Sequence, residues 1–248
     1  MLLQDYLKQY ARVAVAFSGG VDSSYLLYAA KDAGCDVRAY FIKSQFQPRF
    51  ELEDAQRLAG FVGVPMVVGK LDALADPNVA DNPSDRCYYC KNAVLTKLWE
   101  LVRADGILVL CDGSNADDDD SDRPGMRAAR EQGIISPLRD CGLTKADIRR
   151  LSKQAGMFTH DKPSYACLAT RIPAGTSITE ELLQKVESAE AALFDMGFSD
   201  FRVRLVPPDT AKLQMPASQW DLAATRRTEI LAALLPHFNS ATLDIAPR

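Results

Sequence analysis

A run of serine, glycine and aspartate directly after an apolar segment is the first group of residues that could do chemistry. Residues 12–16 have the composition of a buried strand, and Ser18-Gly19-Gly20-Val21-Asp22-Ser23 follows, with a helical pattern of apolar residues after it. The two glycines let the backbone turn sharply and approach an anion, and the N–H groups at the start of the helix point toward that anion. The serines add hydroxyl donors, and the aspartate offers magnesium an oxygen ligand beside phosphates. The run therefore predicts a phosphate-binding loop.

The loop is neither of two common nucleotide motifs. It lacks the Gly-Lys-Ser/Thr ending of a Walker loop and the G-x-G-x-x-G spacing of a dinucleotide fingerprint. A Gly-Ser turn in an ordinary α/β protein is the alternative interpretation.

A cysteine in an irregular segment is a second candidate. Cys167 lies between Pro163 and Pro173, in a stretch too short and irregular for a regular element. Arg171 follows closely, where it would favour the thiolate and attract an anionic substrate. Because exposed loop thiols near cations are reactive, we expect Cys167 to be a reactive thiol.

Cys87 and Cys90 form a C-x-x-C pair at the head of an expected helix. Such a pair suits metal, cluster or redox chemistry. It is incomplete alone, because zinc would need two more ligands and His160 and His237 do not stand at a finger-like spacing from it. Packing beside tyrosines is the alternative. The remaining cysteines are interpreted as structural: Cys35, Cys111 and Cys141.

Oxygen ligands follow the expected strands. Asp112, Gly113 and Asn115 come directly after an apolar run over 107–111, next to the place where the first loop would present a phosphate. Ser44 stands at the end of the expected strand 37–42 and is a nucleotide candidate, since ligands bind at the carboxyl ends of parallel strands. Most of the acidic residues over 117–122 are expected to form a solvated loop.

Two kinds of periodicity divide the chain. Strand, helix and strand alternate up to about residue 68, which is typical of an α/β fold with a doubly wound parallel sheet, and a capped helix after Thr144 closes this domain at residue 162. Residues 163–178 form a linker that carries Cys167. Helices over about 179–196 and 217–235 and strands over 201–206, 211–215 and 241–245 then predict a small α+β domain over 179–248.

Arg202 and Arg204 are two residues apart on an expected strand and therefore share a face. A solvated pair of arginines is the ordinary explanation. Their guanidinium groups also suit bidentate recognition of a phosphate.

Composition limits the classes of partner. The 248 residues carry a net charge of −4, which argues against a protein held mainly by nucleic-acid phosphates or anionic lipid. The first residues include an early acid, and no window approaches the roughly 20 apolar residues of a membrane span. We expect a cytosolic protein whose six cysteines do not form disulfides.

The motifs in combination resemble two nested families. Ser-Gly-Gly-x-Asp-Ser looks like the pyrophosphate loop (PP-loop) of the N-type ATP pyrophosphatases. Nearly the whole chain resembles the LarE family, ATP-dependent sulfur transferases of nickel-pincer nucleotide synthesis for lactate racemase. The motifs that carry this resemblance are Ser18–Ser23, Arg86–Lys91, Asp112–Asp118, Asp122–Gly125, Ser136–Leu138 and Lys162–Pro173.

The resemblance implies a reaction and a site. ATP, with Mg²⁺ held by Asp22, would adenylate a carboxylate of pyridinium-3,5-biscarboxylic acid mononucleotide, and Cys167 would supply the sulfur. A second route keeps Cys87 and Cys90 with Cys167 as ligands of a 4Fe-4S cluster that carries the sulfide. Arg202 and Arg204 would bind the substrate phosphate, with Glu190 near them. Family members form hexamers, so a homo-oligomer is expected.

The sequence departs from the family's pattern near its C-terminal end, and two alternative functions remain open. Relatives usually continue Arg-Val-Arg with an aromatic residue, histidine and glycine, whereas this chain has Leu205-Val-Pro-Pro208 and stops before an expected Gly-rich tail. A tRNA thiolase of the same superfamily also combines this loop with a C-x-x-C and a third cysteine. A non-catalytic nucleotide or metal sensor is the rival from another class.

Overall fold

The computed structural model describes residues 1–118 and 124–246. Most of the acidic run over 117–122, and the first residues of the Asp-Arg-Pro-Gly motif that begins at residue 122, lie outside the described residues. The chain divides into two compact units, one of residues 1–73 and 85–162 and the other of residues 74–84 and 163–248.

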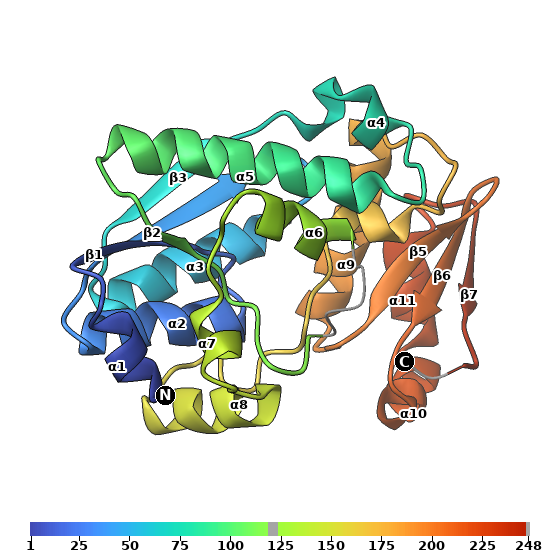
Figure 1. Cartoon of the computed structure of the whole chain (residues 1–248). Helices are drawn as coiled ribbons and strands as arrows, with labels where there is room; N and C mark the ends of the chain where they lie inside the picture. The colour runs from blue at the N-terminus through green and yellow to red at the C-terminus, as the bar shows by residue number, and fades with distance from the viewer. Residues whose placement is uncertain (119–123, 247–248) are drawn as a thin grey trace. The chain divides into compact units, whose positions relative to one another are not determined.

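The first unit contains a parallel sheet in the order β3-β2-β1-β4 (Figure 1). Its strands are β1 (Arg12–Ala16), β2 (Asp36–Lys43), β3 (Met66–Lys70) and β4 (Leu110–Cys111). Its helices are α1 (Leu3–Leu7), α2 (Val21–Asp32), α3 (Arg49–Val62), α5 (Arg86–Ala104), α6 (Pro124–Glu131), α7 (Pro137–Asp140) and α8 (Lys145–Gln154).

Helices cover both faces of this sheet, and residues of one strand alternate between two cores. Val13 and Val15 of β1 pack with α1, α2, α3 and α8, whereas Ala14 packs with α5 and α6 on the other face. This arrangement confirms the predicted doubly wound α/β fold.

β4 is shorter than the predicted strand over 107–111. Leu110 and Cys111 pair with Ala14 and Val15, but Leu108 is 85% exposed. The continuous apolar run therefore predicted too long a strand, because β4 lies at the edge of the sheet and Leu108 faces solvent.

The second unit packs α9 (Glu180–Asp195), α10 (Trp220–Thr225) and α11 (Arg227–Leu234) against a sheet of β5 (Arg202–Val206), β6 (Thr210–Gln214) and β7 (Ser240–Leu243). β5 and β6 are antiparallel, and β7 pairs parallel with β6. The predicted long helix over 217–235 is instead a 3₁₀ turn, Ala217–Gln219, followed by α10 and α11. It breaks at Arg226, whose guanidinium donates to the carbonyl of Met196 at the end of α9.

The second unit also includes residues 74–84, which start within a 3₁₀ turn (Ala73–Ala75) and contain α4 (Pro77–Ala80). The Asn82 side chain donates to the carbonyls of Pro173 at 2.9 Å and Thr176 at 3.1 Å. The N–H of Ile178 donates to the carbonyl of Ala80 at 2.7 Å. These bonds hold the stretch after Cys167 against a loop that lies about 90 residues earlier in the chain.

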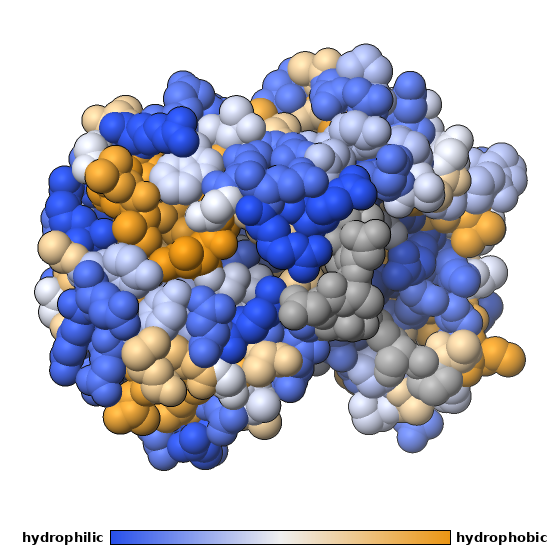
Figure 2. Space-filling view, in the orientation of Figure 1, coloured by the Kyte–Doolittle hydropathy of each residue, from blue (hydrophilic) through white to orange (hydrophobic). Residues whose placement is uncertain are grey.

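The surface seen in Figure 2 is mostly hydrophilic, with separate hydrophobic areas. Large apolar side chains such as Leu108 and Ile245, at 85% and 82% exposed, stand far apart in the sequence. Among the described residues, no helix has both the length and the apolar character needed to cross a membrane.

Candidate active site

The phosphate loop joins β1 to α2 and is held by its own hydroxyls. The Ser18 and Ser23 oxygens lie 3.1 Å apart, and the N–H of Gly20 donates to Ser18 Oγ at 3.3 Å. Gly19 has φ +71°, and a Cβ there would lie 3.2 Å from Ala55 of α3. A glycine is needed at this turn, which directs the first N–H groups of α2 out of the loop.

The loop after β4 touches the same helix start. A Cβ on Gly113 would lie only 2.7 Å from the backbone nitrogen of Ser23, so no other residue fits without moving backbone. Asp112 is 8% exposed, and its carboxylate accepts from Ser114 Oγ at 3.0 Å and Ser136 Oγ at 2.8 Å. The structure thus brings Asp112 and Gly113 beside the phosphate loop.

Asn115 and Ser44 lie on the same edge of the sheet but use their side chains locally. Asn115 is 5% exposed and accepts from the N–H of Asp117 at 2.9 Å. Ser44, just after β2, donates to Gln47 Oε1 through both its N–H, at 2.9 Å, and its hydroxyl, at 2.8 Å. Both residues shape turns at the carboxyl ends of strands.

Asp22 has one oxygen paired and one buried without a partner. Its Oδ2 forms an ion pair with Lys145 of α8, and its Oδ1 has no hydrogen-bond partner in the described part of the chain. A carboxylate oxygen with unmet bonding capacity beside a phosphate loop fits magnesium, which uses one or two carboxylates together with phosphate oxygens and water. The residues present therefore suit Mg²⁺ at Asp22.

Cys87 and Cys90 lie on the first turn of α5. Cys87 is exposed, with Arg86 Nη2 3.7 Å from its sulfur, and Cys90 is half-buried. Three residues apart on a helix, the two thiols face the same side. Over residues 1–118 and 124–246 the structure shows no cluster of three or more Cys, His, Asp or Glu side chains arranged to hold a metal.

The other cysteines are packing residues, as expected. Cys35 and Cys111 lie in the core of the first unit, and Cys141 packs against it. Burial raises the pKa of each of these thiols above its ordinary value, which keeps them protonated and unreactive.

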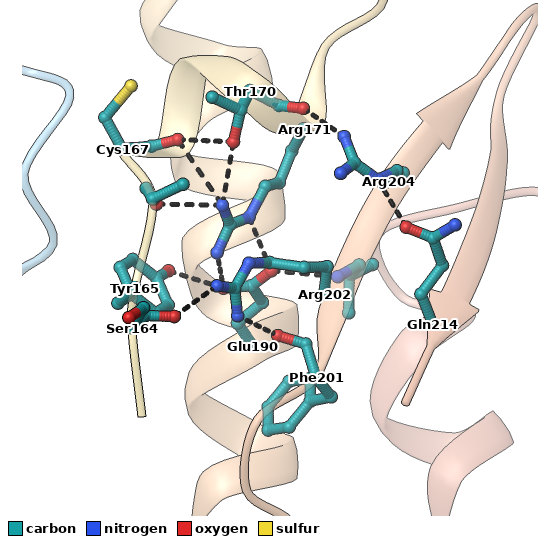
Figure 3. Close-up of polar contacts among 12 residues, drawn as sticks. Ser164, Tyr165, Cys167, Thr170, Arg171, Glu190, Phe201, Arg202, Arg204 and Gln214 are labelled. Carbon is teal, nitrogen blue, oxygen red and sulfur yellow. Dashed lines mark hydrogen bonds and ion pairs between the residues drawn. The ribbon is translucent and has the colours of Figure 1, made fainter. Parts of the chain in front are cut away.

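Cys167 begins a 3₁₀ turn (Leu168–Arg171) that is tied through backbone carbonyls. Arg171 Nη1 donates to the carbonyl of Ala166 at 2.8 Å and to Thr170 Oγ1 at 2.9 Å, and Thr170 Oγ1 donates to the carbonyl of Cys167 at 2.8 Å. Figure 3 shows the Cys167 sulfur pointing away from these guanidinium contacts. Arg171 therefore contacts the backbone around the thiol.

Arg171 and Glu190 form a buried ion pair. Nε and Nη2 donate to the two carboxylate oxygens at 2.8 and 2.9 Å, and the side chains are 0% and 2% exposed. Glu190 also accepts from the N–H of Val203 at 2.8 Å and from the Tyr165 hydroxyl. Burial alone would lower the pKa of Arg171, but the bonds to Glu190 outweigh burial and raise it.

Arg202 and Arg204 reach the Cys167 segment from β5 (Figure 3). Arg202 donates to the carbonyl of Ser164 at 2.6 Å, and Arg204 donates to the carbonyl of Thr170 and to Gln214 Oε1. Burial and then the charge of Arg171 lower the pKa of both. Of the three arginines only Arg171 is hydrogen-bonded to Glu190, although its charge acts on all three. Among the described residues this group therefore has three positive charges against one negative.

Sequence reasoning missed Lys145 and Tyr165. Lys145 stands at the first position of a helix, where the dipole disfavours a cation. Its position in the sequence therefore indicated that it needs an acidic neighbour. Tyr165 contacts two arginines, with its ring centroid 4.5 Å from Arg171 Cζ and 5.0 Å from Arg202 Cζ.

Comparison with known proteins fits this geometry. Residues 11–74 match the model of the tRNA methyl transferase HUP domain. The fold and the loop therefore define a protein with a PP-loop domain of the HUP class.

Relatives match over most of the chain. An uncharacterized protein, slr1717, of Synechocystis is 36% identical and covers 88% of this chain and 81% of its own. The pyridinium-3,5-bisthiocarboxylic acid mononucleotide synthase of Lactiplantibacillus plantarum is 33% identical and covers 86% of this chain and 78% of its own. The chain belongs to the LarE family, as its motifs predicted. The tRNA-specific 2-thiouridylase MnmA of Pseudothermotoga lettingae is 26% identical, over 61% of this chain and 54% of its own.

Proposed function

We propose that this protein is an ATP-dependent sulfur transferase that converts a carboxylate of pyridinium-3,5-biscarboxylic acid mononucleotide into a thiocarboxylate, a step of nickel-pincer cofactor synthesis for lactate racemase-like enzymes. The observation that carries the proposal is the Cys167 segment, fixed by two buried arginines and the half-buried Arg204 in a chain whose other unit has a PP-loop. The similarity to a synthase of the bisthiocarboxylic product supports the choice of substrate.

The first step is adenylation in the first unit. A substrate carboxylate oxygen attacks the α-phosphorus of ATP, the bond to the β-phosphate oxygen breaks, and pyrophosphate leaves. The N–H groups at the start of α2 and the hydroxyls of Ser18 and Ser23 bind phosphate oxygens. Asp22 would hold Mg²⁺, and the metal would supply charge neutralisation of the phosphates.

The second step uses the thiolate of Cys167. Its sulfur attacks the acyl carbon and AMP leaves, which gives a thioester. Loss of the Cys167 Cα proton and cleavage of its Cβ–S bond then release the thiocarboxylate and leave dehydroalanine, with no change in overall oxidation state. An enzyme that follows this route works once.

A cluster route is the alternative source of sulfur. Cys87 and Cys90 offer two thiolates on one helix turn, and Cys167 would be the third ligand. A 4Fe-4S cluster held in this way would supply a sulfide without loss of the cysteine sulfur.

The charge balance around Cys167 supports a role for Arg202 and Arg204 in binding the substrate phosphate. Arginine binds phosphate oxygens in a bidentate manner, and the excess positive charge beside Glu190 favours an anion. Arg171, which is fully buried on Glu190, then acts on the Cys167 backbone.

Intact-protein mass spectrometry before and after turnover, with an iron count on anaerobically purified protein, tests the proposal. A Cys167 lighter by one hydrogen sulfide after turnover, without bound iron, supports the sacrificial route. A brown chromophore that is lost in Cys87→Ala supports the cluster route. Release of AMP and pyrophosphate must depend on the pyridinium substrate, and its absence would favour a non-catalytic sensor.

The match to a tRNA thiouridylase makes a tRNA thiolase the second candidate. Filter binding with bulk tRNA across a salt series distinguishes a tRNA thiolase from the proposed transferase, since the affinity of a tRNA enzyme for tRNA falls steeply as the salt concentration rises. We expect no stable tRNA complex.

Size-exclusion chromatography with light scattering checks the expected homo-oligomer, with a hexamer as the family-based expectation.

A further inference from the structure

Lys145 occupies an unfavourable place for a cation. It is the first residue of α8, next to the N-cap Thr144, where the positive end of the helix dipole lies. The helix start does not depend on its side chain, because Thr144 and Asp147 form a complete capping box, with Thr144 Oγ1 accepting from the N–H of Asp147 at 3.2 Å. The ammonium group is therefore available for another purpose.

The loop after β4 fixes the main chain of Lys145 beside the phosphate loop. The N–H of Lys145 donates to Asp117 Oδ2 at 2.7 Å, and the N–H of Ala116 donates to the carbonyl of Leu143 at 2.8 Å. The same loop contains Gly113, which abuts the first turn of α2. Three elements of the first unit thus converge where the ammonium group of Lys145 meets Asp22.

The ion pair between Lys145 and Asp22 is open to exchange. Its side chains are 30% and 22% exposed, so the pair is accessible from solvent, which screens the attraction between its charges. Asp22 Oδ1 is buried and has no partner within residues 1–118 and 124–246. A carboxylate with this unmet oxygen is suited to a stronger cation, and the ammonium group would then need another anion close by.

We propose that Lys145 is a phosphate-binding residue of the ATP site, which exchanges its ion pair with Asp22 for a phosphate oxygen when magnesium and ATP bind. Lysine binds phosphate as a point charge with rotatable donors, so a short movement of its side chain is enough. The inference deepens the proposed function, on which it rests for the identity of the nucleotide. It predicts that Lys145 distinguishes a nucleotide with a polyphosphate from one with a single phosphate.

Isothermal titration calorimetry of the full chain with α,β-methylene-ATP and with AMP, both with magnesium, tests this. Loss of a charge-assisted bond in Lys145→Ala should weaken binding of the methylene analogue about tenfold. AMP affinity should change much less, and Lys145→Arg should restore most of the analogue affinity. Lys153→Ala, an exposed lysine on the same helix, is the matched control and should bind both ligands like the unaltered protein.

Two results would overturn the inference. One is equal weakening of both ligands in Lys145→Ala, which would mean that the lysine only supports the loop. The other is analogue binding in Lys145→Ala that equals that of Lys153→Ala. Circular dichroism of each variant identifies a folding defect. If Lys145→Ala does not fold, the affinities of Lys145→Arg for the two ligands are compared with those of the unaltered protein instead. If the unaltered protein binds the analogue but transfers no sulfur, the proposed function fails while this inference stands.

Discussion

The buried pair of Arg171 and Glu190 allows a quantitative prediction. Four donors converge on the Glu190 carboxylate: two guanidinium nitrogens at 2.8 and 2.9 Å, the N–H of Val203 at 2.8 Å and the Tyr165 hydroxyl. Glu190→Gln keeps the shape of the side chain but removes its charge. Arg171, 0% exposed, would then be a buried cation without its carboxylate.

Removing one partner of a buried ion pair costs about 3–5 kcal/mol, because the remaining charge stays desolvated. With a urea dependence of about 2 kcal/mol per molar, the unfolding midpoint of the second unit should fall by about 1.5–2.5 M. Proteolysis at the Cys167 segment should increase as well, since Arg171 ties the carbonyl of Ala166 at 2.8 Å.

Fluorescence can measure the second unit separately. The two tryptophans lie in different units, Trp99 in the first and Trp220 in the second. In a Trp99→Phe background, the emission of Trp220 during urea unfolding reports the second unit. The comparison is then Glu190→Gln against its own Trp99→Phe parent.

Asp195→Asn, an exposed position on the same helix, removes the same charge and is the control, with an expected change within about 0.5 kcal/mol. A midpoint shift for Glu190→Gln as small as that of the control would refute the reasoning. Addition of Arg171→Met to Glu190→Gln should recover part of the lost stability, since the uncompensated charge is then gone.

Three further outcomes are expected. Gly113→Ala should abolish binding of α,β-methylene-ATP in calorimetry, because its Cβ would lie 2.7 Å from the Ser23 nitrogen and displace the start of α2. Thr144→Ala should lower the free energy of unfolding, measured in urea, by about 1 kcal/mol through loss of the capping bond. Hydrogen bonds from Gln214 and then Lys212 lower the pKa of Asp244 to about 2. This carboxylate therefore stabilises the fold above its unfolded pKa of about 3.9, and the contribution disappears as pH falls toward 2. A carboxyl NMR titration checks the midpoint, which Gln214→Ala should raise.

The order of strands and helices in the first unit was predictable from sequence because its signals are local. The step from β1 through Ser18–Ser23 into α2 needs only a strand pattern, two glycines and a helix pattern. The helix cap at Thr144 was likewise readable from the acidic residue three positions later.

Contacts between distant segments were not predictable in this way. No local pattern shows that Asn82 donates to the carbonyl of Pro173, or that Lys145 meets Asp22, 123 positions earlier in the chain. The nearness of Arg171 to Cys167 in sequence suggested an action on the thiol. The tertiary fold directs that guanidinium to Glu190 and to the carbonyl of Ala166, because a buried cation requires a carboxylate and hydrogen-bond acceptors around it.

Under the proposed function, holding the Cys167 segment and binding a substrate phosphate are compatible tasks for the same arginines. A guanidinium group has five N–H donors. The bonds to Phe201 and Ser164 engage Nη1 and Nη2 of Arg202, one acceptor each, and Arg204 uses Nε and Nη1. Further N–H groups on each side chain can donate to a phosphate oxygen without release of the carbonyls. A phosphate bound there would reduce the repulsion between the arginines and thereby tighten the segment that carries the thiol, so substrate binding would favour the geometry that sulfur transfer needs.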